Sequence, residues 1–184
     1  MYEVEYKVEI TEEEKDRLIA LLKSRNFTDK GKVLQKDYYV EVKSSSIKGY
    51  DFNRYRDEGG KIFYTEKIWE ENEEVPVHKE MEREVSREEF AKELDRYPNA
   101  LKITKERQIF AGILEGQDFK IDMDSVKFDH SPNMRYFIEV EIMTEKKEEV
   151  SRLRNLIRSF LQKLLEKEEI IESPGMLDMV FNKK

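Results

Sequence analysis

The sequence predicts an α+β fold: an eight-stranded antiparallel β-barrel with a charged lumen and with helices on its outside. Several segments alternate strictly between apolar and charged residues, as strands with one apolar and one charged face do. Glycine-marked turns join strands into hairpins, and no βαβ alternation occurs, so neighbouring strands should be antiparallel. The apolar stripes of the helices need the apolar strand faces as partners, which leaves the charged faces inside.

The composition predicts one domain over residues 1–184. Charged residues make up 41% of the chain, yet the net charge is only −7, because both signs are abundant. A net acidic chain argues against general nucleic-acid binding. The absence of cysteine, of a basic N-terminal leader and of an apolar run of about 20 residues predicts a cytoplasmic protein without a membrane span.

The first part of the chain gives the clearest signals. Residues 2–10 alternate without a break and predict a strand. A helix should follow, because Thr11 and Glu14 form a capping box ahead of an apolar stripe. Alternation predicts the next strand over 33–42, and a serine-rich stretch predicts a loop over 43–49.

The rest of the chain continues as hairpins and helices, with glycine pairs at both hairpin turns. The middle segments are strands over 50–57 and 61–69 around Gly59–Gly60, a loop over 70–77, a strand over 78–85, a helix opened by a capping box of Ser86 and Glu89, and strands over 101–111 and 117–124 around Gly112 and Gly116. The last are a strand over 135–144, a long amphipathic helix over 145–169 and a short helix near 173–181.

The polar faces of the strands carry side chains at a spacing of two, which places each set on one face of its strand. A solvated face is the ordinary interpretation of one such strand. Here the signs are segregated, with acidic pairs on some strands and basic residues on others. The sets are Glu3, Glu5 and Lys7; Arg54 and Arg56; Thr65 and Lys67; Glu80 and Glu82; Lys105 and Arg107; Asp122 and Asp124; and Glu139 and Glu141.

Acidic and basic groups inside a barrel are expensive to desolvate unless a ligand compensates them. A divalent metal on the carboxylates and a polyphosphate on the cations would do so. Carboxylates without histidine or cysteine select Mg²⁺ or Mn²⁺. Arginine forks grip phosphate oxygens, and lysine acts as a point charge.

These residues resemble the CYTH superfamily, also called triphosphate tunnel metalloenzymes. The resemblance rests on motifs that follow in family order from residue 3 to residue 141. They are Glu3-Val4-Glu5-Tyr6-Lys7 (ExExK), Asp37-Tyr38-Tyr39, Arg54-Tyr55-Arg56, Thr65-Glu66-Lys67, Glu80-Met81-Glu82, Lys105-Glu106-Arg107, Met123-Asp124-Ser125-Val126 and Glu139-Val140-Glu141.

The resemblance implies a triphosphate substrate, Mg²⁺ or Mn²⁺ as cofactor, and a role for each motif. Glu3, Glu5, Asp124, Glu139 and Glu141 would hold metal. Lys7, Arg54, Arg56, Lys67, Lys105 and Arg107 would bind phosphates. The catalytic roles would belong to Glu5, Lys7, Glu80 and Glu82. In an alternative register, the acidic pair of the central strand is Glu82 and Glu84. Asp122 shares the polar face but lies outside the matched position.

Three functions stay open at this point: hydrolysis of a triphosphate, cyclic AMP synthesis by a class IV adenylyl cyclase, and polyphosphate or nucleotide binding without turnover. The sequence departs from the family after Lys67, where Ile-Trp-Glu replaces a frequent Gly-Pro, and at 133–137, where a usual L-G-x-F is missing. These departures concern the identity of the substrate. The sequence does not indicate the oligomeric state.

Overall fold

The structure is a computed structural model that describes residues 2–25, 27–44, 50–69 and 78–181. The loop predicted over 70–77, and most of the one predicted over 43–49, lie outside these residues. Within the described chain, no helix is long and apolar enough to cross a bilayer.

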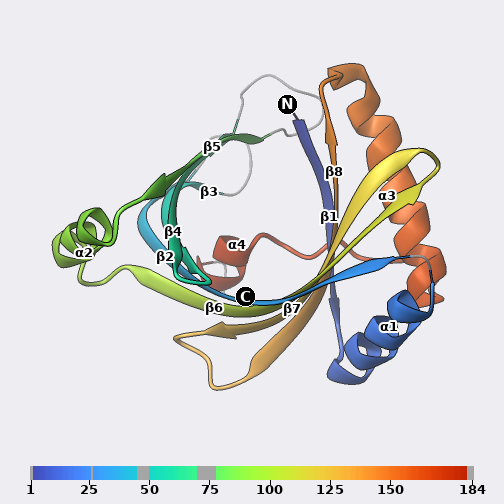
Figure 1. Ribbon diagram of the computed structural model, residues 1–184, viewed down its shortest axis with the longest axis horizontal. Coiled ribbons are helices and arrows are strands. Elements are labelled where there is room, and N and C mark those ends of the chain that lie inside the picture. Colours follow the sequence, from blue (N-terminus) through green and yellow to red (C-terminus); the bar gives the residue numbers. More distant parts are fainter. Residues whose placement is uncertain (1, 26, 45–49, 70–77, 182–184) are drawn as a thin grey trace. The chain divides into compact units, whose positions relative to one another are not determined.

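Eight strands form one sheet in the order β1–β8–β7–β6–β2–β3–β4–β5 (Figure 1). Pairing is antiparallel between β1 and β8, β2 and β3, β3 and β4, and β4 and β5. The strands are β1 (Tyr2–Ile10), β2 (Thr28–Ser44), β3 (Tyr50–Glu58), β4 (Lys61–Trp69), β5 (His78–Val85), β6 (Leu101–Leu114), β7 (Gln117–Phe128) and β8 (Met134–Thr144). The predicted α+β class, with eight antiparallel strands and flanking helices, is confirmed.

The packing of the chain divides it into two compact units. Unit 1 consists of Met1–Val33, Glu106–Val126 and Met134–Ser173, and unit 2 of Leu34–Lys105, Lys127–Asn133 and Pro174–Lys184. Each unit has its own apolar core and its own cluster of charged side chains. The single domain expected over 1–184 stays a prediction.

In unit 1, helices α1 (Glu12–Ser24) and α3 (Val150–Leu165) pack on the apolar face of β1 and β8. Leu18 and Leu153 are fully buried there. The predicted capping box is present, because Thr11 and Glu14 exchange backbone-to-side-chain hydrogen bonds of 2.8 and 3.1 Å. The charged face of β1 is thereby left on the side away from the helices.

In unit 2, helix α2 (Arg87–Arg96) packs on β2 and β3 through Phe90, whose ring lies 5.3 Å from Tyr38 and 5.8 Å from Tyr55. The second predicted capping box forms only in half. Ser86 accepts the backbone N–H of Glu89, but the Glu89 carboxylate pairs with Arg83 instead of returning to the cap. A short helix, α4 (Met176–Phe181), closes the described chain.

Several predicted boundaries differ from the structure. β2 begins at Thr28, not at residue 33, and β7 ends at Phe128, not at residue 124. The β6–β7 turn lies at Glu115 and Gly116, which both have positive φ angles. Gly112 instead lies within β6, where a Cβ atom would come 2.5 Å from the Phe27 ring. The helix predicted over 145–169 is a short 3-10 turn, η1 (Lys147–Glu149), followed by α3, which ends where Glu166 adopts the left-handed conformation.

Candidate functional site

The first charged cluster lies in unit 1, on the polar face of β1 and β8. The register places Glu5 directly opposite Glu141, and Lys7 directly opposite Glu139. Nζ of Lys7 lies 3.4 Å from Oε2 of Glu139. Burial disfavours the charged lysine, but Glu139, Glu5 and Asp124 outweigh burial and raise the pKa of Lys7. Lys7 is therefore a fixed cation within a row of acids.

Arg107 on β6 ties three predicted acidic residues together. Its guanidinium donates to both Asp124 oxygens at 2.8 and 2.7 Å, and to Oε2 of Glu139 at 3.2 Å. It also forms an ion pair with Asp122. Burial opposes its charge, yet these carboxylates raise the pKa of Arg107 well above its ordinary value. A buried bidentate contact of this kind fixes the direction in which the guanidinium points.

Asp122 on β7 is a buried acid of this cluster with two cations beside it. Its side chain is 1% exposed, and its Oδ2 forms ion pairs with Arg107 and with Lys120. Neither of its oxygens accepts a well-directed hydrogen bond from a described residue. Burial therefore dominates and raises the pKa of Asp122 to about 6, although Arg107 and Lys120 act in the opposite direction.

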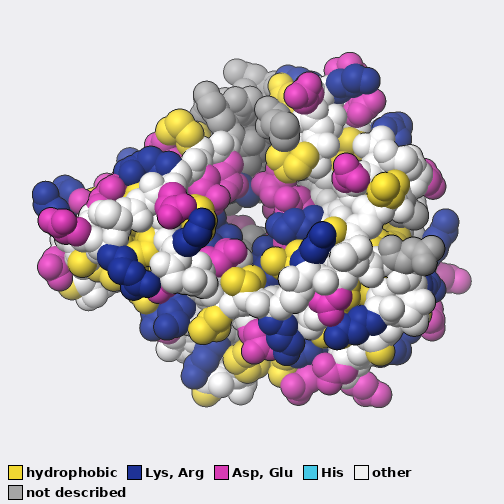
Figure 2. Space-filling view, in the orientation of Figure 1, with side chains coloured by type: hydrophobic (Ala, Val, Ile, Leu, Met, Phe, Trp, Pro, Cys, Tyr) yellow, Lys and Arg dark blue, Asp and Glu magenta, His cyan; other side chains and the backbone are white. Residues whose placement is uncertain are grey.

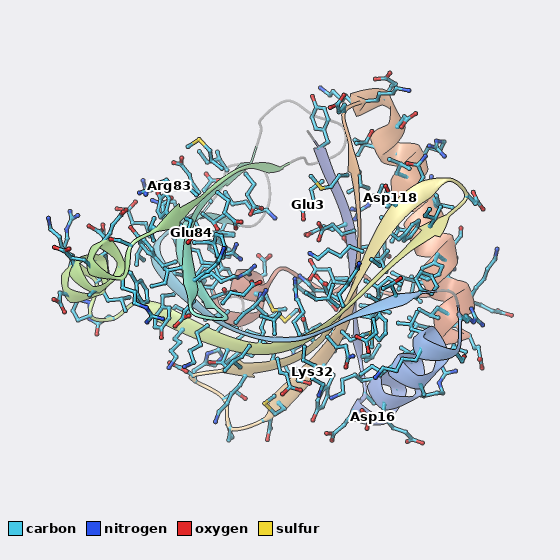
Figure 3. All side chains as sticks on the ribbon, in the orientation of Figure 1. Glu3, Asp16, Lys32, Arg83, Glu84 and Asp118 are labelled. Atoms are coloured by element: carbon cyan, nitrogen blue, oxygen red, sulfur yellow. The ribbon has the colours of Figure 1, made fainter. Side chains whose placement is uncertain are left out.

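Replacing Asp122 by asparagine should stabilise unit 1 at neutral pH. A carboxyl group with a raised folded-state pKa contributes stability below its ordinary pKa and loses it as the pH rises through about 6. We expect Asp122→Asn to melt a few degrees higher than wild type at pH 7.5, with the difference vanishing near pH 4. Thermal melts across this range check the prediction, with Asp118→Asn as the exposed control on the same strand (Figure 3). A lower melting temperature at pH 7.5 would contradict it.

The second charged cluster lies in unit 2 around Asp37 of β2, whose side chain is fully buried. The register places Asp37 opposite Arg56, which donates to its two oxygens at 2.7 and 3.1 Å. Nζ of Lys105 lies 2.9 Å from the same carboxylate, and a nitrogen of Arg54 lies 3.8 Å from it. Burial raises the pKa of Asp37, but Lys105, Arg54 and Arg56 outweigh burial and hold it well below its ordinary value.

Arg54 connects Asp37 to the polar face of β4 and β5. Its Nη2 donates to Oγ1 of Thr65 at 3.0 Å and lies 3.8 and 3.9 Å from Glu80 and Glu82. Its buried Nε has no hydrogen-bond acceptor among the described residues. The guanidinium therefore keeps a donor that a ligand oxygen could fill.

The structure also bears on the register of the central acidic strand. Glu80 lies opposite Lys67, at 3.4 Å between charged atoms, and Glu82 lies opposite Thr65 and accepts its hydroxyl at 3.1 Å. Glu84 lies opposite Phe63 and pairs with the exposed Lys61. Glu80 and Glu82 thus contact predicted phosphate-binding residues, as the first register requires. Their catalytic role stays a prediction.

Two residues of these clusters were missed as site residues. The sequence indicates Asp37 only as part of a motif, yet it is the carboxylate on which Arg54, Arg56 and Lys105 converge. Lys120 belongs to none of the sequence motifs, although its Nζ lies 2.9 Å from Glu141 and 3.1 Å from Asp122. Burial disfavours its charge, but these two acids raise its pKa. The spacing of Lys120, Asp122 and Asp124 was the available signal.

The carboxylates of unit 1 fit a hard divalent cation in kind. They offer only oxygen donors, and the direct opposition of Glu5 and Glu141 is unfavourable unless a cation lies near. Among the described residues, no three such side chains gather around one point. Lys7, Arg107 and Lys120 instead hold the acids apart in ion pairs. When bound, Mg²⁺ or Mn²⁺ would neutralise phosphate charge and polarise a water molecule, with Glu5 and Glu141 as the best-placed holders.

The two clusters carry opposite charge excesses. In unit 1, the carboxylates of Glu3, Glu5, Asp122, Asp124, Glu139 and Glu141 outnumber the cations Lys7, Arg107 and Lys120. In unit 2, the cations Arg54, Arg56, Lys67 and Lys105 outnumber the carboxylates of Asp37, Glu80 and Glu82 by one. Over the visible surface, in contrast, both signs are interspersed (Figure 2). Unit 1 can therefore accept a cation, and unit 2 an anion.

The chain belongs to the CYTH domain family, whose model matches residues 1–172. Among solved structures, the PH1819 protein of Pyrococcus horikoshii OT3 is 22% identical, with a TM-score of 0.69 and all of both chains covered. A candidate adenylate cyclase of Vibrio parahaemolyticus is 15% identical, with a TM-score of 0.68 and 98% of each chain covered. A candidate adenylyl cyclase of Hippeastrum, described as having a dominant triphosphatase activity, is 16% identical, with a TM-score of 0.58 and coverages of 99% and 95%. None of the curated proteins matches the chain.

Proposed function

We propose that this protein hydrolyses a triphosphate in a metal-dependent reaction. The observation that carries the proposal is the convergence of three cations, Arg54, Arg56 and Lys105, on the buried carboxylate of Asp37 in unit 2. Several cations gathered at one point attract an anion, and arginine forks match the geometry of phosphate oxygens. Membership of the CYTH family, whose members process triphosphates, supports the same substrate class.

In this proposal, the residues of the two clusters have separate tasks. Arg54, Arg56, Lys67 and Lys105, with Lys7 and Arg107, bind the phosphates and neutralise the charge that develops on them. Glu3, Glu5, Asp124, Glu139 and Glu141 hold Mg²⁺ or Mn²⁺. Glu80 and Glu82 orient Arg54 and Lys67, which they already contact. We propose the cytoplasm as the compartment, because the chain has no cysteine.

Adenylyl cyclase activity is the second candidate. It is favoured by a neighbour named as a candidate adenylate cyclase that covers 98% of this chain. A cyclase would bind the same phosphates but direct the ribose 3′-hydroxyl at the α-phosphorus. The Hippeastrum neighbour, named as a cyclase candidate yet described by a dominant triphosphatase activity, supports hydrolysis as the first choice.

Product analysis with a panel of triphosphates tests the proposal. Inorganic triphosphate, thiamine triphosphate and ATP are each incubated with Mg²⁺, with Mn²⁺ and with a chelator. We expect phosphate release that needs the metal and is lost with the chelator. Formation of cyclic AMP and pyrophosphate, with ATP as the only substrate that reacts, would support the cyclase reaction and reject hydrolysis. Tight binding without any product would reject both reactions.

A further inference from the structure

Lys120 of β7 is a cation placed directly on a predicted metal ligand. Its Nζ donates a hydrogen bond of 2.9 Å to Oε2 of Glu141 and lies 3.1 Å from Oδ2 of Asp122. Lys120 and Asp122 are two residues apart on β7 and share one face of the strand. One ammonium group is thus shared by carboxylates from β7 and β8, all within unit 1.

The register of β1 and β8 shows why a cation is needed at this point. Glu5 and Glu141 lie directly opposite each other, and like charges in that position destabilise a sheet. Glu139, the next acid on this face of β8, is neutralised by Lys7 and Arg107. Lys120 does for Glu141 what those two cations do for Glu139.

We propose, building on the proposed function, that Lys120 is an internal counter-cation that competes with the divalent metal for Glu141. Mg²⁺ and Mn²⁺ bind carboxylate oxygens directly, so metal binding at Glu141 requires the Lys120 ammonium to leave. The lysine can leave because its side chain is 40% exposed. The metal affinity of the acidic row is therefore lower than that of the same carboxylates without Lys120.

The test compares how tightly Lys120→Met and Lys32→Met bind Mn²⁺ alone. Electron paramagnetic resonance of the free ion measures the binding. Lys32 is the matched control, because it also forms a lysine–glutamate pair in unit 1, 3.0 Å from Glu106, but an exposed one. Figure 3 shows Lys32 on β2, away from Glu3 on β1. We expect Lys120→Met to bind Mn²⁺ about fivefold more tightly than wild type, which is the effect of releasing one half-exposed ion pair. Lys32→Met and the charge-conserving Lys120→Arg should bind as wild type does.

Loss of Lys120 removes a counter-ion from buried Asp122 and could prevent folding, so Lys120→Met with Asp122→Asn is the second variant. It removes both charges together and should also bind Mn²⁺ more tightly. Binding equal to or weaker than that of wild type in the folded variants that lack the Lys120 charge, or no Mn²⁺ binding by any of the proteins, would overturn this inference. Hydrolysis by wild type is measured separately, so tighter binding by Lys120→Met together with an inactive wild type would reject only the proposed function.

Discussion

Replacing Glu5 by glutamine should abolish most of the hydrolysis of inorganic triphosphate, lowering kcat/KM about 1,000-fold, a loss of several kcal/mol of transition-state stabilisation. Glu5 lies opposite Glu141 on the polar face of β1, and its charge contributes to the raised pKa of Lys7. An amide keeps the size of the side chain but carries no charge, so it is a poor ligand for Mg²⁺ or Mn²⁺. Phosphate release at saturating metal measures the loss.

Glu9→Gln is the matched control for this prediction. Glu9 lies on the same strand and the same face as Glu5, but it is exposed and its carboxylate accepts two hydrogen bonds from Arg135, at 2.7 and 2.5 Å. We expect its kcat/KM to stay within about twofold of wild type, as for most surface substitutions. Similar losses in both variants would show that general surface charge, and not a ligand at position 5, supports the activity. Full activity of Glu5→Gln would reject Glu5 as a metal ligand.

The strands that alternate without interruption were predicted best, because burial of one face leaves little freedom in their register. β1 begins and ends at residues 2 and 10, as its alternation indicates. The glycine pattern predicts the turn between β6 and β7 too early, because it assigns Gly112 to the turn. Its absent side chain instead makes room for Phe27, a residue distant in sequence.

The members of the charged clusters were largely predictable, but their partners were not. Spacing assigns Arg54, Arg56 and Lys105 to polar faces, and nothing in the spacing identifies Asp37 as their common anchor. That contact depends on the pairing of β2 with β3, which sets Asp37 opposite Arg56, and on a register shift between Tyr39 and Glu41. Cross-strand register is a tertiary property, so a single sequence does not reveal it.

Asp37 carries the second large expected effect, which is on stability. Replacing it by asparagine leaves Arg56, Lys105 and Arg54 in a buried site without their carboxylate. Breaking a buried ion pair from one side costs about 3–5 kcal/mol, which for a chain of this size lowers Tm by about 10 °C. The folded-state pKa of Asp37 is depressed. The carboxylate therefore contributes its full share of the folding stability above the ordinary pKa of an aspartate, and this share is lost only when the pH falls through the lower, folded-state value. The loss in Tm should therefore be equal at pH 5.5 and pH 8, which thermal melts at both values measure.

Glu89→Gln is the control in the same unit. The Glu89 carboxylate also accepts hydrogen bonds from two nitrogens of an arginine, Arg83, but both of these side chains are substantially exposed. Its Tm should change little. An equal loss of Tm in Asp37→Asn and Glu89→Gln would mean that the burial of the Asp37 cluster adds nothing to the folding stability.

The Asp37→Asn variant also separates a structural role of the basic cluster from a phosphate-binding one. Once Asp37 is neutral, Arg54, Arg56 and Lys105 lack their shared anion, so an added polyanion that binds these cations should stabilise the variant more than wild type. Tripolyphosphate added without metal should therefore raise the Tm of Asp37→Asn more than that of wild type, whereas Glu89→Gln should respond as wild type does. Equal shifts in all three proteins would place the phosphate elsewhere than on these three cations. The melting temperature thus tests the phosphate site without requiring turnover of substrate.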